Sequence, residues 1–409
     1  MSALPQWEAG GAAPRLRVLH LSGSNVRGGA EEHMLTLLRG LDRKRFQLYL
    51  ACTPALLPQL SDLPADVRVE PCAPRKPWQA GTGWRLCRWL QAERIDLVHA
   101  HLSFASRAAA PWVKLARGPL LLETPHVSEN WRRGWKRAAW LDHAAGGLVD
   151  GYIAVSDANA DYLGRQRGLP VRKIHTIRNG VDVARFDRSP RHPSDPRASL
   201  GVAPGEMLLV CVARLEPQKG HAVLLEAVAR LPRGRGPKLR LVCLGDGRLR
   251  SALQLQAQQL GLADTVLFPG YCPQIEAWLA VADIFVLPSM YEGLPLSVME
   301  AAAAGCAIVA TAVDGTPELL ADGRDGLLVP PGHPEALAQA LLRLIADAGL
   351  RKALGEHARQ RAREEFDQAH QIAATSTLYV ELGNARAAQR GRVPADPCLP
   401  PTAVGGERG

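Results

Sequence analysis

The chain has 409 residues, of which 47% are apolar and 22% charged, and its formal net charge at pH 7 is +9. This length suits two domains of ordinary size, and the sequence lacks the run of about 18 uncharged apolar residues that a transmembrane helix needs. Residues 1–15 hold no apolar stretch of a secretory signal, and the eight cysteines show no zinc spacing, so we expect a protein of the reducing cytoplasm.

In the first half of the chain, short apolar runs that predict strands alternate with helical patterns. The predicted strands are Leu16–Ser22, Phe46–Cys52, Ile95–Ala100, Leu120–Glu123 and Tyr152–Val155. The helices between them include Ala30–Leu41, Gly83–Glu93 and Asp157–Gln166. This alternation is typical of a parallel α/β sheet.

Residues 189–204 interrupt this pattern, because they are rich in proline and serine and have no apolar period. We interpret them as a linker. A second α/β series follows, with strands at Met207–Ala213, Leu239–Leu244, Val266–Phe268, Ile284–Leu287, Ala307–Ala310 and Gly326–Val329. Its helices include Gly220–Leu231, Arg248–Leu260, Ser297–Ala304, Glu335–Ala348 and Leu350–Glu365.

Two such series predict an α/β protein with two Rossmann-like, doubly wound domains that face each other across a cleft. We expect these domains at 15–188 and 205–366, a C-terminal helix at 367–383 that crosses back to the first domain, and disordered ends at 1–14 and 384–409. Ligands of such sheets bind at the carboxyl ends of the strands. The loops that follow the strands are therefore where we look for a site.

Two glutamates follow the predicted strand Ile284–Leu287. Glu292 lies in a Glu-Gly turn, and Glu300 lies one turn into a helix that begins near Pro295. The free N–H groups of a helix start suit a diphosphate, and the two carboxylates suit the hydroxyls of a sugar and a ribose. An isolated pair with this spacing would more often be solvated surface glutamates, but the strand–turn–helix setting favours a binding site.

Two cations, Arg214 and Lys219, follow the first strand of the second series and precede its first helix. Cations in this loop would neutralise a diphosphate leaving group, and the alternative is a pair of solvated loop side chains. The matching turn of the first series contains Gly28 and Gly29, which let the backbone approach a phosphate or a sugar closely. Their spacing is not Gly-x-Gly-x-x-Gly, which disfavours a dinucleotide-dependent dehydrogenase.

Histidines follow the apolar runs of the first series: His99 and His101 come after Ile95–Val98, and His126 comes after Leu120–Glu123. A neutral imidazole there would hydrogen-bond a sugar hydroxyl or a phosphate, although a lone His126 would more often be structural. We expect no metal, because no third ligand lies nearby in sequence and the chain has no Asp-x-Asp pair.

The segment from Asn130 to Leu141 interleaves aromatic and basic side chains, namely Trp131, Arg132, Arg133, Trp135, Lys136, Arg137 and Trp140. Residues 1–195 carry 28 Lys and Arg against 18 Asp and Glu, whereas the remainder carries 21 against 22. A basic first half favours an anionic partner. Three interpretations of the segment stay open: contact with an anionic membrane, a core-packing stripe, and a site for an acceptor phosphate.

Taken in order, these motifs resemble the family 4 retaining glycosyltransferases of the GT-B fold. The resemblance runs from about Leu16 to Leu382 and rests on segments that are moderately specific singly and highly specific together. They are Arg27-Gly28-Gly29-Ala30-Glu31, Asp96 to His101, Glu123 to His126, Ala154-Val155-Ser156, Asn179 to Asp182, Arg214 with Lys219, Gly245-Asp246-Gly247, and Tyr291-Glu292-Gly293 through Glu300.

The resemblance implies roles for these residues. Glu292 and His126 would lie by the donor sugar, Glu300 at the ribose, Arg214 and Lys219 at the diphosphate, and Gly270 and Tyr271 at the edge of the base. Gly28 and Gly29 would approach the donor from the other domain. The family's motif often reads Glu-Gly-Phe-Gly-Leu-Pro, whereas here Gly293 leads directly to Leu294 and Pro295.

The resemblance implies a metal-independent enzyme without a cofactor that moves a sugar from a nucleoside diphosphate sugar to a hydroxyl with retention. The basic first half suggests a bacterial surface glycan or glycolipid acceptor, as in polysaccharide or lipopolysaccharide biosynthesis, and a place on the inner face of the cytoplasmic membrane. The alternatives are another GT-B enzyme, such as a sugar-nucleotide epimerase or a phosphorylase, and a non-catalytic scaffold. The sequence has no nucleic-acid-binding module.

Overall fold

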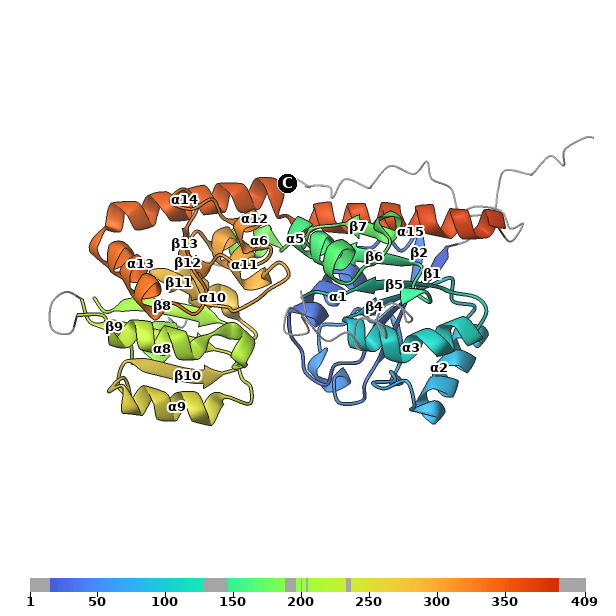
Figure 1. Ribbon diagram of the computed structural model, residues 1–409, viewed down its shortest axis with the longest axis horizontal. Coiled ribbons are helices and arrows are strands. Elements are labelled where there is room, and N and C mark those ends of the chain that lie inside the picture. Colours follow the sequence, from blue (N-terminus) through green and yellow to red (C-terminus); the bar gives the residue numbers. More distant parts are fainter. Residues whose placement is uncertain are drawn as a thin grey trace, which may run out of the picture. The chain divides into compact units, whose positions relative to one another are not determined.

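The computed structural model describes residues 15–127, 146–187, 196–199, 201–203, 205–232 and 237–389 (Figure 1). Their contacts divide them into two compact units. The first unit contains residues 15–124, 146–152 and 372–389, and the second contains residues 125–127 and the described part of 153–371. These units are defined by contacts between residues, and the domain boundaries expected from the sequence stay a prediction.

The first sheet has the strand order β3-β2-β1-β4-β5-β6-β7. Its strands are β1 (Leu16–Ser22), β2 (Phe46–Cys52), β3 (Arg68–Glu70), β4 (Leu97–His101), β5 (Leu120–Thr124), β6 (Gly151–Ala154) and β7 (Ile174–Thr176). β1 lies between β2 and β4 and pairs with both in parallel. The prediction missed β3 and β7, because each has three residues and neither is fully buried, so no apolar run marks them.

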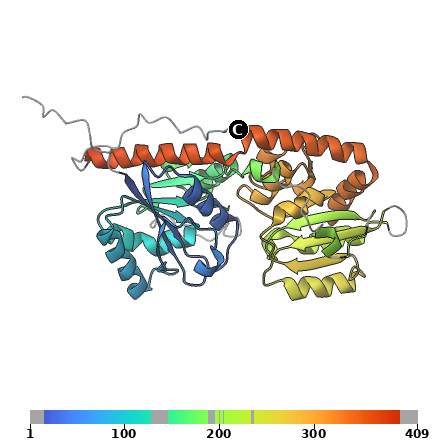
Figure 2. The same ribbon diagram turned by 180° about the vertical axis from the view of Figure 1, so that it is seen from behind.

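Two groups of helices cover this sheet. Helix α1 (Gly29–Gly40) and helix α15 (Gln368–Gln389) contribute side chains to one apolar cluster with Leu16 and Val18 of β1. Helices α2 (Ala80–Ala92) and α3 (Ser103–Leu115) contact each other, and α3 contacts β4 and β5. Figures 1 and 2 show α15 along one side of the sheet and the α2–α3 pair on the other.

The second sheet is parallel throughout, with the strand order β10-β9-β8-β11-β12-β13. Its strands are β8 (Met207–Val212), β9 (Leu239–Leu244), β10 (Val266–Gly270), β11 (Ile284–Leu287), β12 (Ala307–Thr311) and β13 (Leu327–Val329). The predicted strands agree with these bounds to within two residues. Both series are therefore parallel α/β structures, as the alternating pattern predicted.

Alternate residues of these strands enter two different cores, as expected for a sheet that is covered on both faces. One core packs the sheet against α10 (Ile275–Val281), α11 (Leu296–Ala304) and α14 (Ala348–Glu365). The other packs it against α8 (His221–Ala229), α9 (Arg250–Gln259) and α13 (Pro334–Ala346).

The last helix differs from its predicted length, because α15 continues to Gln389 instead of ending near Leu382. Residues 384–389 read Asn-Ala-Arg-Ala-Ala-Gln, and alanine, arginine and glutamine are good helix formers. Among the helices of the described ranges, none combines the length and the hydrophobicity that a membrane-spanning segment requires.

Candidate active site

The central pair of strands in the second sheet, β8 and β11, marks the point where the strand order reverses direction. Chain crossovers lead away from this point on both sides, so the loops after β8 and β11 diverge and leave room for a ligand. Arg214 and Lys219 follow β8, and Glu292 follows β11. The two groups that the sequence singled out therefore flank the same switch point.

Lys219 and Glu292 form an ion pair at this point. Lys219 ends a 3-10 helix at Pro217–Lys219, and its Nζ donates to Oε1 of Glu292 at 2.5 Å. The Ser289 Oγ donates to the same carboxylate oxygen at 2.6 Å. The side chains of Lys219 and Glu292 are 16% and 5% exposed. Both charges are largely removed from water, and burying either one alone would be costly. Each therefore depends on the other for its stability in this position.

The backbone next to Lys219 is also constrained. Gly220 follows it with a φ of +66°, and a Cβ at this position would clash with the carbonyl oxygen of Pro288. The Met290 N–H donates to Gln218 O at 2.7 Å, and the Gln218 side chain donates to Tyr291 O at 2.9 Å. The loops after β8 and β11 are therefore joined by hydrogen bonds as well as by the ion pair.

Residues from two further loops hold the Glu292 turn, and the sequence did not predict this role for them. Asp314 follows β12, and its Oδ2 accepts the N–H of Glu292 at 2.7 Å. Gly315 N–H donates to Gly293 O at 3.1 Å. The Ser156 Oγ donates to the same oxygen at 3.2 Å. The signal that these residues share is their position, because each follows the carboxyl end of a predicted strand.

His126 lies against this turn through its backbone. The residue is 9% exposed and has a φ of +64°, and its neighbour Val127 forms an antiparallel bridge with Gly293. A Cβ on Gly293 would clash with the carbonyl oxygen of His126. Asp314 also has a positive φ, of +42°. Positive φ is uncommon outside glycine and costs energy, and such residues gather at functional sites.

Helix α11 begins directly after this turn. Pro295 is its N-cap, with extended backbone, and Leu296 is its first helical residue. The side chain of Asn179 donates to Leu294 O at 3.1 Å and so fixes the approach to the helix. The first N–H groups of a helix have no partner within it and attract anions. Glu300 lies on the same helix and is half-buried.

The remaining predicted donor residues lie in both units. Arg214 is exposed, and Tyr271 is 59% exposed directly after β10, where Gly270 has a φ of +100°. Gly28 and Gly29 belong to the first unit, where α1 begins. The Gly28 N–H donates to Oε2 of Glu31 at 3.0 Å. The shared role of these residues in one donor site stays a prediction.

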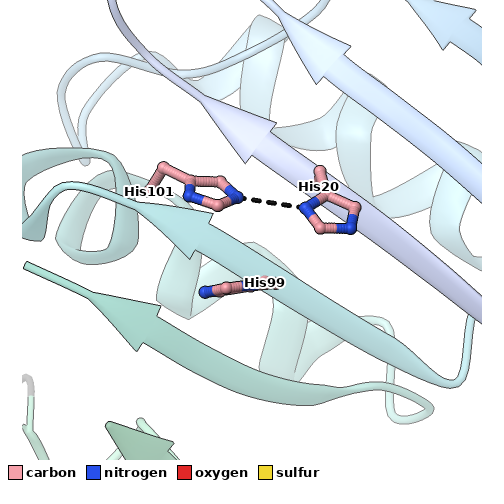
Figure 3. Close-up of side chains that lie close together, drawn as sticks. All are labelled: His20, His99 and His101. Atoms are coloured by element: carbon pink, nitrogen blue, oxygen red, sulfur yellow. Dashed lines mark hydrogen bonds between the residues drawn. The ribbon is translucent and has the colours of Figure 1, made fainter. Parts of the chain in front are cut away.

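The structure corrects the expectation for His99 and His101, which lie within β4 and are fully buried instead of in a loop. Figure 3 shows them beside His20 of β1. His20 Nδ1 and His101 Nε2 share a hydrogen bond of 3.0 Å, and His99 uses its two ring nitrogens for Tyr379 OH at 2.5 Å and Thr124 Oγ1 at 2.6 Å. The three imidazoles therefore form part of the packing beneath α15.

These imidazoles also meet a simple distance criterion for a metal site, since one ring nitrogen of each lies within 4.8 Å of the others. Coordination by His99 would break one of its two short hydrogen bonds, so we assign the cluster to packing. The absence of a metal from the reaction stays a prediction. The predicted membrane or acceptor residues Trp131, Arg132, Arg133, Trp135, Lys136 and Arg137 lie outside the described residues.

The buried cluster predicts acid sensitivity. Burial, with smaller contributions from His33 and Arg43, lowers the pKa of His20 from 6.5 to about 3. In the unfolded chain, His20 binds a proton near pH 6.5. The contribution of its neutral form to stability is therefore fully present above that pH and is lost as the pH falls toward 3. We expect the free energy of unfolding, measured in urea, to fall by about 1.4 kcal/mol per pH unit below pH 6 for this group.

The test compares His20→Gln with His370→Gln, because His370 lies exposed on α15. His20→Gln is expected to weaken the pH dependence, whereas His370→Gln should leave it unchanged. Burial also lowers the pKa of His221 in the second unit to about 4, with a contribution from Lys219, so part of the dependence should remain in His20→Gln. Identical slopes in the wild type and His20→Gln would show that His20 does not cause the effect.

Comparisons with known proteins identify the family. The model of the family described as Glycosyltransferase Family 4 matches residues 27–185, and the model described as Glycosyl transferases group 1 matches residues 195–361. The chain is 31% identical over 319 residues to alpha-maltose-1-phosphate synthase of Mycolicibacterium smegmatis, which covers 70% of this chain and 79% of that relative.

Two further comparisons concern a second relative and the fold. The chain is 33% identical over 310 residues to D-inositol 3-phosphate glycosyltransferase of Streptomyces bingchenggensis, which covers 72% of this chain but only 63% of that relative. The solved structure of Anabaena HepE in complex with UDP-glucose superimposes with a TM-score of 0.78 at 24% identity, and covers 89% of this chain and 99% of the other. The chain thus belongs to glycosyltransferase family 4 and has the predicted GT-B fold.

Proposed function

We propose that this protein transfers a sugar from a nucleoside diphosphate sugar to a hydroxyl group, with retention of the anomeric configuration. The observation that carries the proposal is the buried pair of Lys219 and Glu292 at the switch point of the second sheet. Family membership and the UDP-glucose bound to the HepE structure support the choice of donor.

The chemistry follows from the residues around this pair. The bond between the sugar C1 and the diphosphate oxygen breaks, and negative charge develops on the departing diphosphate. Arg214, Lys219 and the first N–H groups of α11 are the donors proposed to stabilise that charge, which is the largest catalytic effect in many enzymes. No metal is needed in this scheme, because the positive field comes from the protein.

The acceptor oxygen bonds to C1 on the face that the diphosphate leaves. Its hydroxyl proton passes to an oxygen of the departing diphosphate, so atoms and charges balance. The Glu292 carboxylate accepts hydrogen bonds from Lys219 and Ser289, which makes it a weak nucleophile and a good partner for a sugar hydroxyl. This arrangement favours direct transfer over a glycosyl-enzyme intermediate.

The acceptor is proposed to be a bacterial surface glycan or a lipid-linked precursor, and the protein is proposed to work in the cytoplasm, at times at the membrane surface. The excess of positive charge in residues 1–195 supports an anionic acceptor or surface. The two relatives described above have names that refer to different phosphorylated compounds.

The donor is tested by thermal unfolding with UDP-, GDP-, ADP- and dTDP-sugars in the absence of divalent metal. We expect one nucleotide to raise the midpoint, because a ligand that binds only the folded state stabilises it. Slow hydrolysis of that donor should accompany binding, and Glu300→Ala should lose both. Glu356→Ala, which changes an exposed glutamate of α14, is the control and should keep both. No shift with any donor would contradict the proposal and favour a scaffold.

A further inference from the structure

The first unit contains two adjoining cavities at the carboxyl ends of its strands. Their volumes are about 610 and 690 Å³, and they share Arg75 and Gln79. Residues of the wall follow successive strands: Asn25 after β1, Thr53 after β2 and Arg75 after β3. Carboxyl ends of parallel strands are where ligands of such sheets bind. The size of each cavity is that of a small-molecule site.

Two of the three cations at this wall are not neutralised, whereas Arg85 pairs with Glu70. Arg75 and Lys76 are exposed, and neither side chain forms an ion pair within the described ranges. Nearby arginines of the same unit differ, since Arg27 pairs with Glu32 and Asp62. Arg39 and Arg43 also have carboxylate partners. Arg75 and Lys76 are therefore cations of the cavity wall whose side chains have no carboxylate partner in the described ranges.

The loop that carries these cations is held in one conformation by its own hydrogen bonds. The backbone N–H groups of Arg75 and Lys76 donate to Oε1 of Gln79 at 2.7 and 3.1 Å. The Gln79 N–H donates to Lys76 O at 3.1 Å, and the Ala80 N–H donates to Trp78 O at 2.9 Å. A loop that is ordered before binding loses less entropy when the ligand arrives.

An aromatic surface adjoins the cations. Trp78 is 74% exposed, and the Nζ of Lys76 lies 5.3 Å from the centre of its ring. Phe104, half-buried on α3, lines the same cavity. An indole face offers a flat apolar surface that suits the C–H face of a sugar ring, while its N–H end stays polar. Cations beside an exposed indole thus match a ligand with both a sugar ring and an anionic group.

We propose that these cavities bind the acceptor and that the acceptor carries a phosphate or a carboxylate close to the sugar that receives the transfer. The planar guanidinium of Arg75 donates two hydrogen bonds to the anionic group, and the ammonium of Lys76 adds a second positive charge. The indole of Trp78 packs on the sugar ring. This inference rests on the proposed function, because it assigns the second substrate of that reaction. Its chemical class is an acidic or phosphorylated glycan, either free or lipid-linked.

The test uses α-D-glucose 1-phosphate as the anionic probe and methyl α-D-glucopyranoside as the neutral one. The double variant Arg75→Ala/Lys76→Ala is compared with Lys44→Ala/Arg88→Ala, which removes two exposed cations of the same unit away from the cavities. Binding is measured by calorimetry with the donor site filled by the nucleotide found in the panel above. We expect the first double variant to bind glucose 1-phosphate at least about tenfold more weakly, and the control to match the wild type.

Further arms separate the possible outcomes. Trp78→Ala should weaken both probes, whereas Arg75→Ala/Lys76→Ala should affect only the anionic one. Equal affinity for glucose 1-phosphate in the two double variants, or no saturable binding to the wild type, would overturn the inference. Binding to phosphatidylglycerol-containing vesicles that depends on Arg75 and Lys76, without binding of the sugar phosphate, would overturn it in favour of a membrane surface. Donor-induced stabilisation in every variant shows that the donor site of the proposed function is intact, so a loss of acceptor binding concerns this inference alone.

Discussion

Lys219→Ala is expected to reduce turnover by about 10²–10³-fold, because the lysine is one of the few cations proposed to meet the charge of the leaving diphosphate. Its Nζ lies 2.5 Å from the Glu292 carboxylate, and both side chains are largely buried. The same change leaves Glu292 buried without its cation, so we also expect a loss of about 3–5 kcal/mol in the free energy of unfolding. Steady-state transfer and urea unfolding measure the two effects.

A double variant separates the structural effect from the catalytic one. Lys219→Met/Glu292→Gln removes both charges and keeps their approximate volume, so most of the lost stability should return while turnover stays low. Lys238→Ala removes an exposed lysine of the same unit and is the control for a change in charge. Near-normal turnover in Lys219→Ala, or recovery of turnover in the double variant, would rule out the proposed role of the pair.

Gly293→Ala is expected to impair the site without touching any charged group. The new Cβ would clash with the carbonyl oxygen of His126, and the backbone of Gly293 is held by Gly315 and Ser156. Overpacking of this kind costs about 1–3 kcal/mol. The turn must shift to relieve it, and a shift of about 1 Å in the neighbouring Glu292 can reduce turnover about 100-fold.

The matched control is Gly164→Ala, because a Cβ there meets only ordinary contacts, the nearest 3.8 Å away at Ile174. Thermal unfolding and steady-state transfer should change little in this variant. A crystal structure of Gly293→Ala with the Glu292 carboxylate in its original place, together with normal turnover, would show that the close approach is not what positions the site.

The sequence predicted the fold and singled out charged residues that the structure brings together, and their catalytic roles stay a prediction. Every predicted strand is present, because buried parallel strands are short apolar runs bounded by turns. Lys219 and Glu292 were found because charged residues after such strands are conspicuous. The strands β3 and β7 were missed because half-buried edge strands have no such signature.

Contacts between segments that are distant in the chain could not be predicted from the sequence. Nothing local distinguishes Asp314 or Ser156 as a support of the Glu292 turn, since each depends on how separate loops meet. The positive φ of His126 could not be predicted, because positive φ is uncommon in residues other than glycine. The sequence places His99 and His101 after their strand, because the alternation of apolar and polar positions does not reveal that the polar ones are buried.

The way in which the first unit is divided along the chain has a consequence for biosynthesis. Residues 372–389 belong to this unit, and Tyr379 and Val380 of α15 enter the same apolar cluster as Leu16 and Val18 of β1. During translation, β1 emerges more than 350 residues before these partners. The part of this sheet face that α15 covers must therefore stay exposed while the second unit, whose segments are complete earlier, folds. We therefore expect chaperones to bind mainly the apolar surface that the first unit exposes before α15 is synthesised.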